Sequence, residues 1–186
     1  AVYSGPFVTL AKEEFSNSGN ANVQKWSAYL KGVPNRQDYL RTALDWVSRG
    51  DIDGYMSIHR YDTDISDLKN YFNTVIDWIG TVFTDVEKEM RGLEWGQMYE
   101  QYHRNSYNPS EIQARVRELY ADPDITKHAG IFQFVLGGET NPRLLNIRAF
   151  SDTDKKAKYA EQTNQAKAEG ISNCPTCNTD TEYQHT

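Results

Sequence analysis

Apolar residues recur at helical spacing through most of the chain, and no stretch keeps the alternating pattern of a β-strand for long. Between residues 36 and 50, Leu40, Leu44 and Val47 fall on one helical face. Gly50 follows at the position where a C-terminal cap belongs. This segment therefore predicts an amphipathic helix with one buried face.

The longest helical pattern covers residues 64–83 and predicts the central helix of a core. Acidic residues at its front favour the positive end of the helix dipole. Its apolar stripe consists of Ile65, Leu68, Phe72, Val75, Ile76 and Ile79.

A third helix is predicted within residues 108–124. Asn108 can cap it, Pro109 fits the first helical position, and Glu111 stands three residues after the cap, as in a capping box. Its buried stripe is Ile112, Val116 and Leu119. Shorter helices are predicted over residues 6–15, 22–31, 51–60, 93–104 and 130–136.

Two glycines and a proline interrupt the helical pattern in Gly137–Arg143. The sequence therefore predicts a mainly α chain, in which residues 1–138 form a multi-helix bundle. Residues 139–170 are predicted to form a linker and a short polar helix with a basic bias. Residues 171–186 hold both cysteines and are interpreted as the beginning of a truncated zinc knuckle.

The composition is that of a folded protein, with 12 tyrosines, 7 phenylalanines and 4 tryptophans available for burial. Core packing is predicted for the tryptophans, which lie in helical patterns among apolar neighbours: Trp26, Trp46, Trp78 and Trp95. No run approaches the roughly 20 apolar residues that span a bilayer, and the N-terminus lacks the features of a signal peptide. We therefore expect a cytoplasmic protein that makes no contact with a membrane.

The formal net charge of −6 argues against a protein that binds nucleic acid over its whole surface. The charge is unevenly distributed, however. Residues 1–140 carry 14 Lys and Arg against 20 Asp and Glu, whereas residues 141–170 carry 6 against 4. The basic bias thus lies just before the cysteines.

Cys174 and Cys177 are the only cysteines, and their C-x-x-C spacing can hold one metal ion from a tight turn. A structural zinc site usually has four ligands, and His185 is the only further candidate nearby, so the site needs ligands from outside this chain. Two other interpretations stay open. The pair could be ordinary surface thiols, or a redox pair, although no βαβ pattern precedes it.

The C-terminal segment 144–177 resembles the entry to the HNH module of a group of bacterial endonucleases. The resemblance rests on an Arg-x-Phe turn, a lysine-rich helix with Tyr and Gln, and the C-x-x-C knuckle. The matching residues are Arg148, Phe150, Lys155, Lys156, Tyr159, Gln162, Cys174 and Cys177. Upstream, residues 36–60, 75–79 and 89–99 are similar to the helical region that follows a GmrS-type, ParB-like domain in the same proteins.

This resemblance implies that the chain is the non-catalytic middle of a longer DNA endonuclease of the restriction or phage-defence type. The Asp-His pair, the Asn and the second metal-binding pair of the HNH motif are not in the sequence, so we expect no catalytic residue in it. The resemblance further implies structural zinc at Cys174 and Cys177, a divalent metal such as Mg²⁺ in the parent nuclease, and DNA as the partner. The residues expected to contact DNA phosphates are Arg143, Arg148, Lys155, Lys156 and Lys158.

An alternative reading belongs to another functional class. A solvated polar helix carries the same lysines, and the chain would then be a helical interaction or scaffold domain with a C-terminal linker. Metal binding and DNA binding distinguish the two readings.

Overall fold

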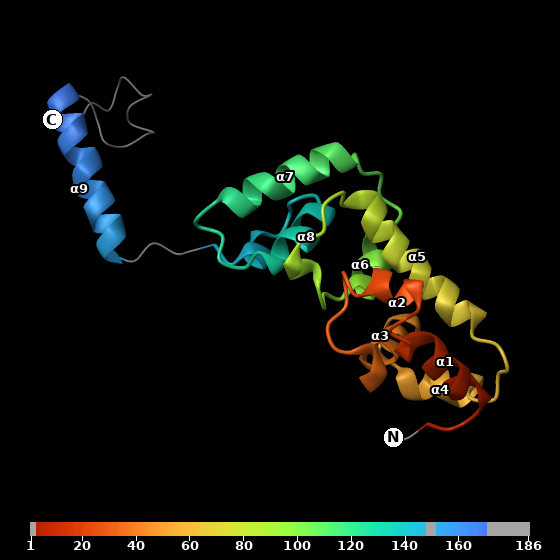
Figure 1. Ribbon diagram of the computed structural model, residues 1–186. Helices are drawn as coiled ribbons and strands as arrows, with labels where there is room; N and C mark the ends of the chain where they lie inside the picture. The colour runs from red at the N-terminus through yellow and green to blue at the C-terminus, as the bar shows by residue number, and fades with distance from the viewer. Residues whose placement is uncertain (1–2, 148–151, 171–186) are drawn as a thin grey trace. The chain divides into compact units, whose positions relative to one another are not determined.

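The computed structural model describes residues 3–147 and 152–170, with the side chains of 152–155 excluded. It divides into a first unit, Ala1–Ile147, and a second unit, Arg148–Thr186. Each unit is described by itself (Figure 1). Within the described residues all regular structure is helical, apart from one isolated bridge between Ile125 and Ile147. The predicted mainly α fold is confirmed.

Eight α-helices and three short 3₁₀ helices make up the described part of the first unit. The α-helices are α1 Pro6–Ser16, α2 Ala21–Trp26, α3 Asp38–Ser48, α4 Ile52–His59, α5 Ser66–Val82, α6 Trp95–Tyr102, α7 Pro109–Ala121 and α8 Ala129–Leu136. The 3₁₀ helices are η1 Pro34–Arg36, η2 Lys88–Met90 and η3 Pro142–Leu145. The second unit contains α9, Asp152–Glu169.

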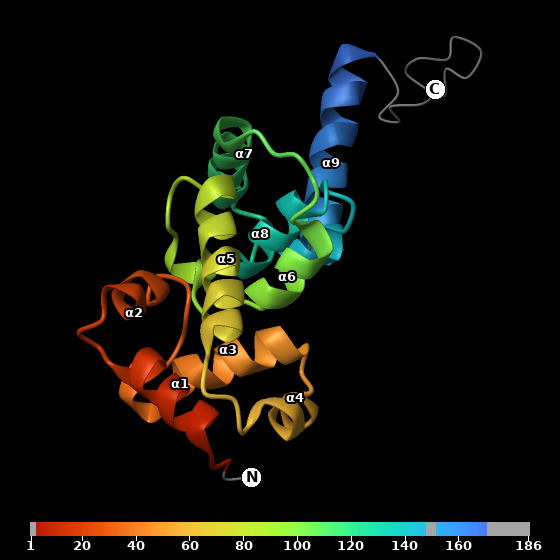
Figure 2. The same ribbon diagram turned by 90° about the vertical axis from the view of Figure 1, so that its right-hand side faces the viewer.

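Helix α5 runs through the first unit, as its long apolar stripe predicts. Figures 1 and 2 show α1, α3 and α4 near one end of α5, and α7 and α8 near the other. The stripe residues Leu68, Phe72, Val75, Ile76 and Ile79 are all buried. Burial of such a stripe is the main source of stability for a helix of this kind.

Two aromatic clusters fill the core along α5. In one, Phe72 of α5 stacks on Trp46 with ring centroids 4.9 Å apart and meets Trp26 edge-on at 5.0 Å. In the other, Phe132 packs against Phe83 and Trp95 at 5.5 and 6.1 Å. Core packing is confirmed for Trp26, Trp46 and Trp95, while Trp78 is half-buried against Tyr99.

The helix predicted over residues 22–31 is shorter than expected, because it ends at Trp26. After Trp26 the chain makes i→i−3 turns, in which the amides of Ala28 and Tyr29 donate to the carbonyls of Lys25 and Trp26 at 3.4 and 3.0 Å. The carbonyl of Tyr29 accepts the amide of Gly92 at 2.8 Å, and the amide of Val33 donates to the Asp38 carboxylate at 2.7 Å. The α-helical pattern is therefore lost directly after Trp26, and these two hydrogen bonds hold the segment that follows.

The residues after α8 pack back onto it. The amide of Lys127 donates to the Leu145 carbonyl at 3.1 Å, and η3 lies against α8. The first unit thus continues to Ile147, past the glycine-rich break in the sequence. Among the described helices, none combines the length and apolar character needed to cross a membrane.

Candidate functional site

Three of the five predicted phosphate-binding residues have described side chains. Arg143, Lys156 and Lys158 are exposed. Arg148 lies outside the described residues, and Lys155 falls in α9 at a position whose side chain lies outside them.

Helix α9 does not bring Lys156 and Lys158 to one side. Successive residues of a helix are rotated by about 100°, so residues two apart lie on nearly opposite sides of it. Lys158 pairs with Glu161 at 2.8 Å, and this hydrogen bond raises the pKa of Lys158 above its usual value. Lys156 has no ion pair with another described residue. Of these two lysines, Lys156 is therefore the one whose ammonium group is available to contact an anion.

Lys167 shares the face of Lys156, and sequence reasoning missed it. Eleven residues separate the two, which corresponds to about three full helical turns. Lys167 is exposed and has no ion pair within the described part of the chain. A search for repeated cations at helical spacing, instead of consecutive ones, would have found this pair.

Arg143 belongs to the first unit, where it lies in η3. It has no ion pair with any described residue, so its guanidinium is available for an external anion. The lysines of α9 belong to the second unit, and the two units are described separately.

The predicted zinc ligands Cys174 and Cys177 lie outside the described residues. Within the described ranges, no three His, Cys, Asp or Glu side chains are grouped so that they could hold a metal ion.

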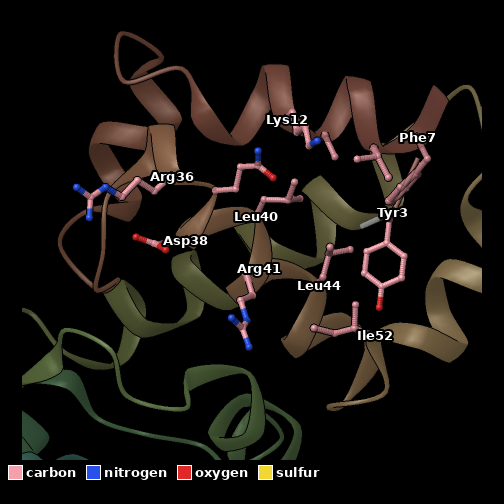
Figure 3. Close-up of a pocket in the computed structure, with 12 residues that line it drawn as sticks. Tyr3, Phe7, Lys12, Arg36, Asp38, Leu40, Arg41, Leu44 and Ile52 are labelled. Atoms are coloured by element: carbon pink, nitrogen blue, oxygen red, sulfur yellow. The ribbon is translucent and has the colours of Figure 1, made fainter. Parts of the chain in front are cut away.

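The first unit contains a cavity of about 570 Å³ between α1, η1 and α3, which sequence reasoning missed. Figure 3 shows its lining. Buried apolar side chains of α1 and α3, including Phe7 and Leu40, form its inner wall. Half-buried Tyr3 and Ile52 line the end near α4.

Three cations line the rest of this cavity: Lys12 of α1, Arg36 of η1 and Arg41 of α3. None of them forms an ion pair or a side-chain hydrogen bond with another described residue. They come from three separate elements, so no sequence spacing groups them. Lys12 follows Ala11 and Arg41 follows Leu40, whereas Arg36 stands between two polar residues, so the neighbours of the three cations give no common signal.

The acidic and phenolic groups at the cavity are already engaged. Asp38 accepts the Val33 amide at 2.7 Å. The hydroxyl of Tyr3 donates to the Asp53 carboxylate, and this hydrogen bond raises the pKa of Tyr3 above its usual value. The cavity therefore has an apolar inner wall, and its cations lie at separate points of its edge (Figure 3).

Comparison of the chain with protein-family models, with curated proteins and with solved structures finds no match.

Proposed function

We propose that this chain is the non-catalytic helical part of a DNA-directed HNH-type endonuclease, with DNA phosphates contacted by the segment 143–158. The observation that supports this proposal most directly is the separation of charge between the two units. Residues 1–147 carry 15 Lys and Arg against 20 Asp and Glu, whereas residues 148–170 carry 5 against 4. A polyanion is repelled less by the second segment than by the first.

The polar character of α9 supports the same assignment. Its described side chains are almost all exposed, and they include Lys156 and Lys167 on one face. Lysine ammonium groups on an exposed helix contact phosphate oxygens without reading sequence. Such contacts would position a nuclease module on DNA and leave cleavage to residues elsewhere.

Structural zinc belongs to this proposal. Cys174 and Cys177 would supply two thiolates, and the remaining ligands would come from outside the chain. A divalent metal such as Mg²⁺ would act in the parent nuclease, where it would polarise the phosphate under attack. In a cobalt titration of a longer chain that supplies the outside ligands, the thiolate-to-metal absorption should appear, and it should be absent when Cys174→Ser/Cys177→Ser is introduced into the same longer chain.

DNA binding tests the proposal through its salt dependence. Fluorescence anisotropy with a short duplex would be measured over a range of salt concentrations for the wild type and for Lys155→Gln/Lys156→Gln/Lys158→Gln. Each lysine that contacts a phosphate contributes about 0.9 to the slope of log K against log salt, so the triple variant should have a shallower slope.

The matched control neutralises three exposed cations of the first unit, Lys31, Arg104 and Lys127. This variant should keep the wild-type slope. If the slope fell equally in the control variant and in the α9 variant, the lysines of α9 would have no particular role in DNA binding.

A second candidate is a helical interaction domain, and the acidic first unit favours it. An excess of carboxylates suits contacts with a basic protein surface better than contacts with DNA. Absence of any DNA binding by the full chain at low salt would favour this candidate over the first.

A further inference from the structure

Another cavity of the first unit lies where α3 packs against α6. Its volume of about 360 Å³ falls in the range of about 300–1,000 Å³ that is typical for ligand pockets. The C-terminal half of α3, the two residues after it and the first turns of α6 supply the lining. All of these residues belong to the first unit, so the cavity does not depend on how the two units are arranged.

Trp46 lines this cavity, and only 4% of its surface is exposed. The other two buried tryptophans use their indole N–H groups: Trp26 donates to the Asn73 side chain at 2.9 Å, and Trp95 donates to the Met90 carbonyl at 2.8 Å. The indole N–H of Trp46 donates to no described residue. A buried indole N–H usually has an acceptor, so this donor is an exception that calls for a physical explanation.

The unpaired N–H lies on the edge of the indole ring that borders the cavity. Cγ and Cδ1 of Trp46 lie so close to Gly96 that a Cβ atom at Gly96 would clash with them. Nε1 is bonded to Cδ1 and so belongs to the same edge, and Gly96 lines the cavity. A neighbouring cavity of about 240 Å³ also borders Trp46 but is not lined by Gly96.

The N–H of Trp46 is also accessible. Among the described residues, the fully enclosed side-chain atoms that lack a hydrogen-bond partner are Ser16 Oγ and Gln113 Nε2, and Trp46 Nε1 is not one of them. An acceptor placed in the cavity can therefore reach this N–H.

The charges around the cavity limit what this acceptor can be. Asp45, Glu94 and Glu100 line it, and Arg49 is the only cation among its described lining residues. Arg49 donates to Glu100 at 2.8 Å, whereas Asp45 and Glu94 have no ion pair with a described residue. Unpaired carboxylates are common on this unit and do not define a site by themselves, but they repel an anionic acceptor. A neutral oxygen is therefore favoured as the partner of the indole N–H.

We infer that this cavity binds a small neutral amide or urea whose carbonyl oxygen accepts the indole N–H of Trp46. The N–H groups of the same ligand would donate to the Asp45 carboxylate, which is half-buried and lines the same cavity. A hydrogen bond to a carboxylate is stronger than one between neutral groups. This site shares no residue with the proposed DNA contacts.

The test follows the indole N–H resonances of the full chain, labelled with ¹⁵N, during a titration with benzamide. The resonance of Trp46 should shift in a saturable manner, because its N–H gains an acceptor. The resonances of Trp26 and Trp95 should stay in place, since both N–H groups already have acceptors within the protein.

Asp45→Asn should weaken the binding of benzamide about three- to tenfold, because it removes the charge that accepts the amide N–H. Glu13→Gln is the matched control. It removes an exposed carboxylate of α1 that does not line the cavity, so it should bind benzamide as the wild type does. Far-ultraviolet circular dichroism checks that both variants remain folded.

Two analogues of benzamide separate the acceptor from the charge. Benzamidine has N–H donors and a positive charge but no acceptor for the indole N–H. Benzoate has an acceptor, but its negative charge is repelled by the carboxylates. Each should bind at least about tenfold more weakly than benzamide.

Three results would overturn the inference. A Trp46 indole resonance that stays in place at millimolar benzamide would show that water alone meets this N–H. Binding of benzamidine or benzoate as tight as that of benzamide would contradict the neutral acceptor. An equal loss of affinity in Asp45→Asn and Glu13→Gln would remove the role of Asp45.

Discussion

Glycine residues determine how closely some helices of the first unit approach their neighbours. Gly130 of α8 lies against the backbone of Leu144, and Gly96 of α6 lies against the ring of Trp46. A Cβ atom at either position would enter the space of the neighbouring group. The consequences differ, because the obstacle at Gly130 is a backbone carbonyl that cannot rotate away.

Gly130→Ala should destabilise the protein by about 1–3 kcal/mol, since the added methyl group overpacks the contact between α8 and η3. Denaturant unfolding of the full chain measures this change. Gly80→Ala is the control, because Gly80 is an exposed helical residue whose nearest obstacle, the Tyr29 hydroxyl, is 4.0 Å away. It should stabilise the protein by about 0.4–1 kcal/mol. Equal changes in the free energy of unfolding for the two substitutions would contradict the close approach of Gly130 to the backbone of Leu144.

Glu14 should contribute a pH-dependent part of the stability. Burial alone would raise the pKa of Glu14, but hydrogen bonds from Lys69 and Asn22 hold it below its usual value of 4.5. Lys69 Nζ lies 2.8 Å from Glu14 Oε1. Because the folded pKa is depressed, this contribution is present above the unfolded pKa and is lost as the pH falls through the folded value.

Glu14→Gln should therefore lower the free energy of unfolding at neutral pH and lower it less, or not at all, at pH values well below 4.5. Denaturant unfolding at several pH values gives the comparison. Lys158→Gln/Glu161→Gln removes an exposed pair of α9 and should leave the pH dependence almost unchanged. A constant effect of Glu14→Gln over the whole pH range would show that the carboxylate contributes no charge interaction.

Residue-level sequence reasoning succeeded where local chemistry decides the outcome. Asn108 caps α7, as predicted, because its side chain accepts the Ser110 amide at 3.1 Å. Glu111 differs in detail, since it accepts from the Asn108 side chain at 2.8 Å instead of from its backbone. That Lys12, Arg36 and Arg41 line one cavity could not be predicted, because they come from separate elements whose packing forms the cavity.

At the scale of single helices, hydrophobic periodicity located most elements but not all of their ends. Helix α5 occupies Ser66–Val82, within the predicted 64–83. Helix α2 ends early, where i→i−3 hydrogen bonds of the Ala28 and Tyr29 amides replace the α-helical pattern. Periodicity records which residues are buried, whereas it holds no information on such changes in backbone hydrogen bonding.

The cap of α7 provides a test at this scale. Asn108→Ala should destabilise the protein by about 1 kcal/mol, because the Ser110 amide loses its acceptor at the start of the helix. Thermal unfolding followed by circular dichroism detects the change. Ser106→Ala alters an exposed neighbour outside the helix and should have almost no effect. Equal destabilisation by both substitutions would contradict the capping role of Asn108.

At the scale of the whole molecule, the described hydrophobic cluster lies in the first unit, and α9 contributes one buried apolar residue, Ala166, among its described side chains. The buried cluster extends from Phe7 to Leu145 and includes both aromatic groups around α5. Helix α9, by contrast, is polar over most of its described surface. The sequence predicted this difference in character from the alanine-rich and lysine-rich segment after the glycines, while the zinc site and the DNA contacts remain predictions.

Residues 1–147 expressed alone should fold, because the described hydrophobic cluster is complete within them. Their thermal transition should be cooperative and should have nearly the midpoint of the full chain. Near-ultraviolet circular dichroism of the buried tryptophans gives a second readout. A transition that is broad, or shifted down by more than about 10 °C, would show that the second unit stabilises the first.

The DNA affinity of the full chain, compared with that of residues 1–147, tests the central proposal most directly. Fluorescence anisotropy with one short DNA duplex, measured at low salt and then at rising salt concentrations, gives both affinities and their salt dependence. The account predicts that the full chain binds with a strongly salt-dependent affinity and that residues 1–147 bind at least about tenfold more weakly, because the acidic unit lacks the lysines of α9. Equal affinities, or no binding by the full chain, would contradict the proposal that the C-terminal segment contacts DNA.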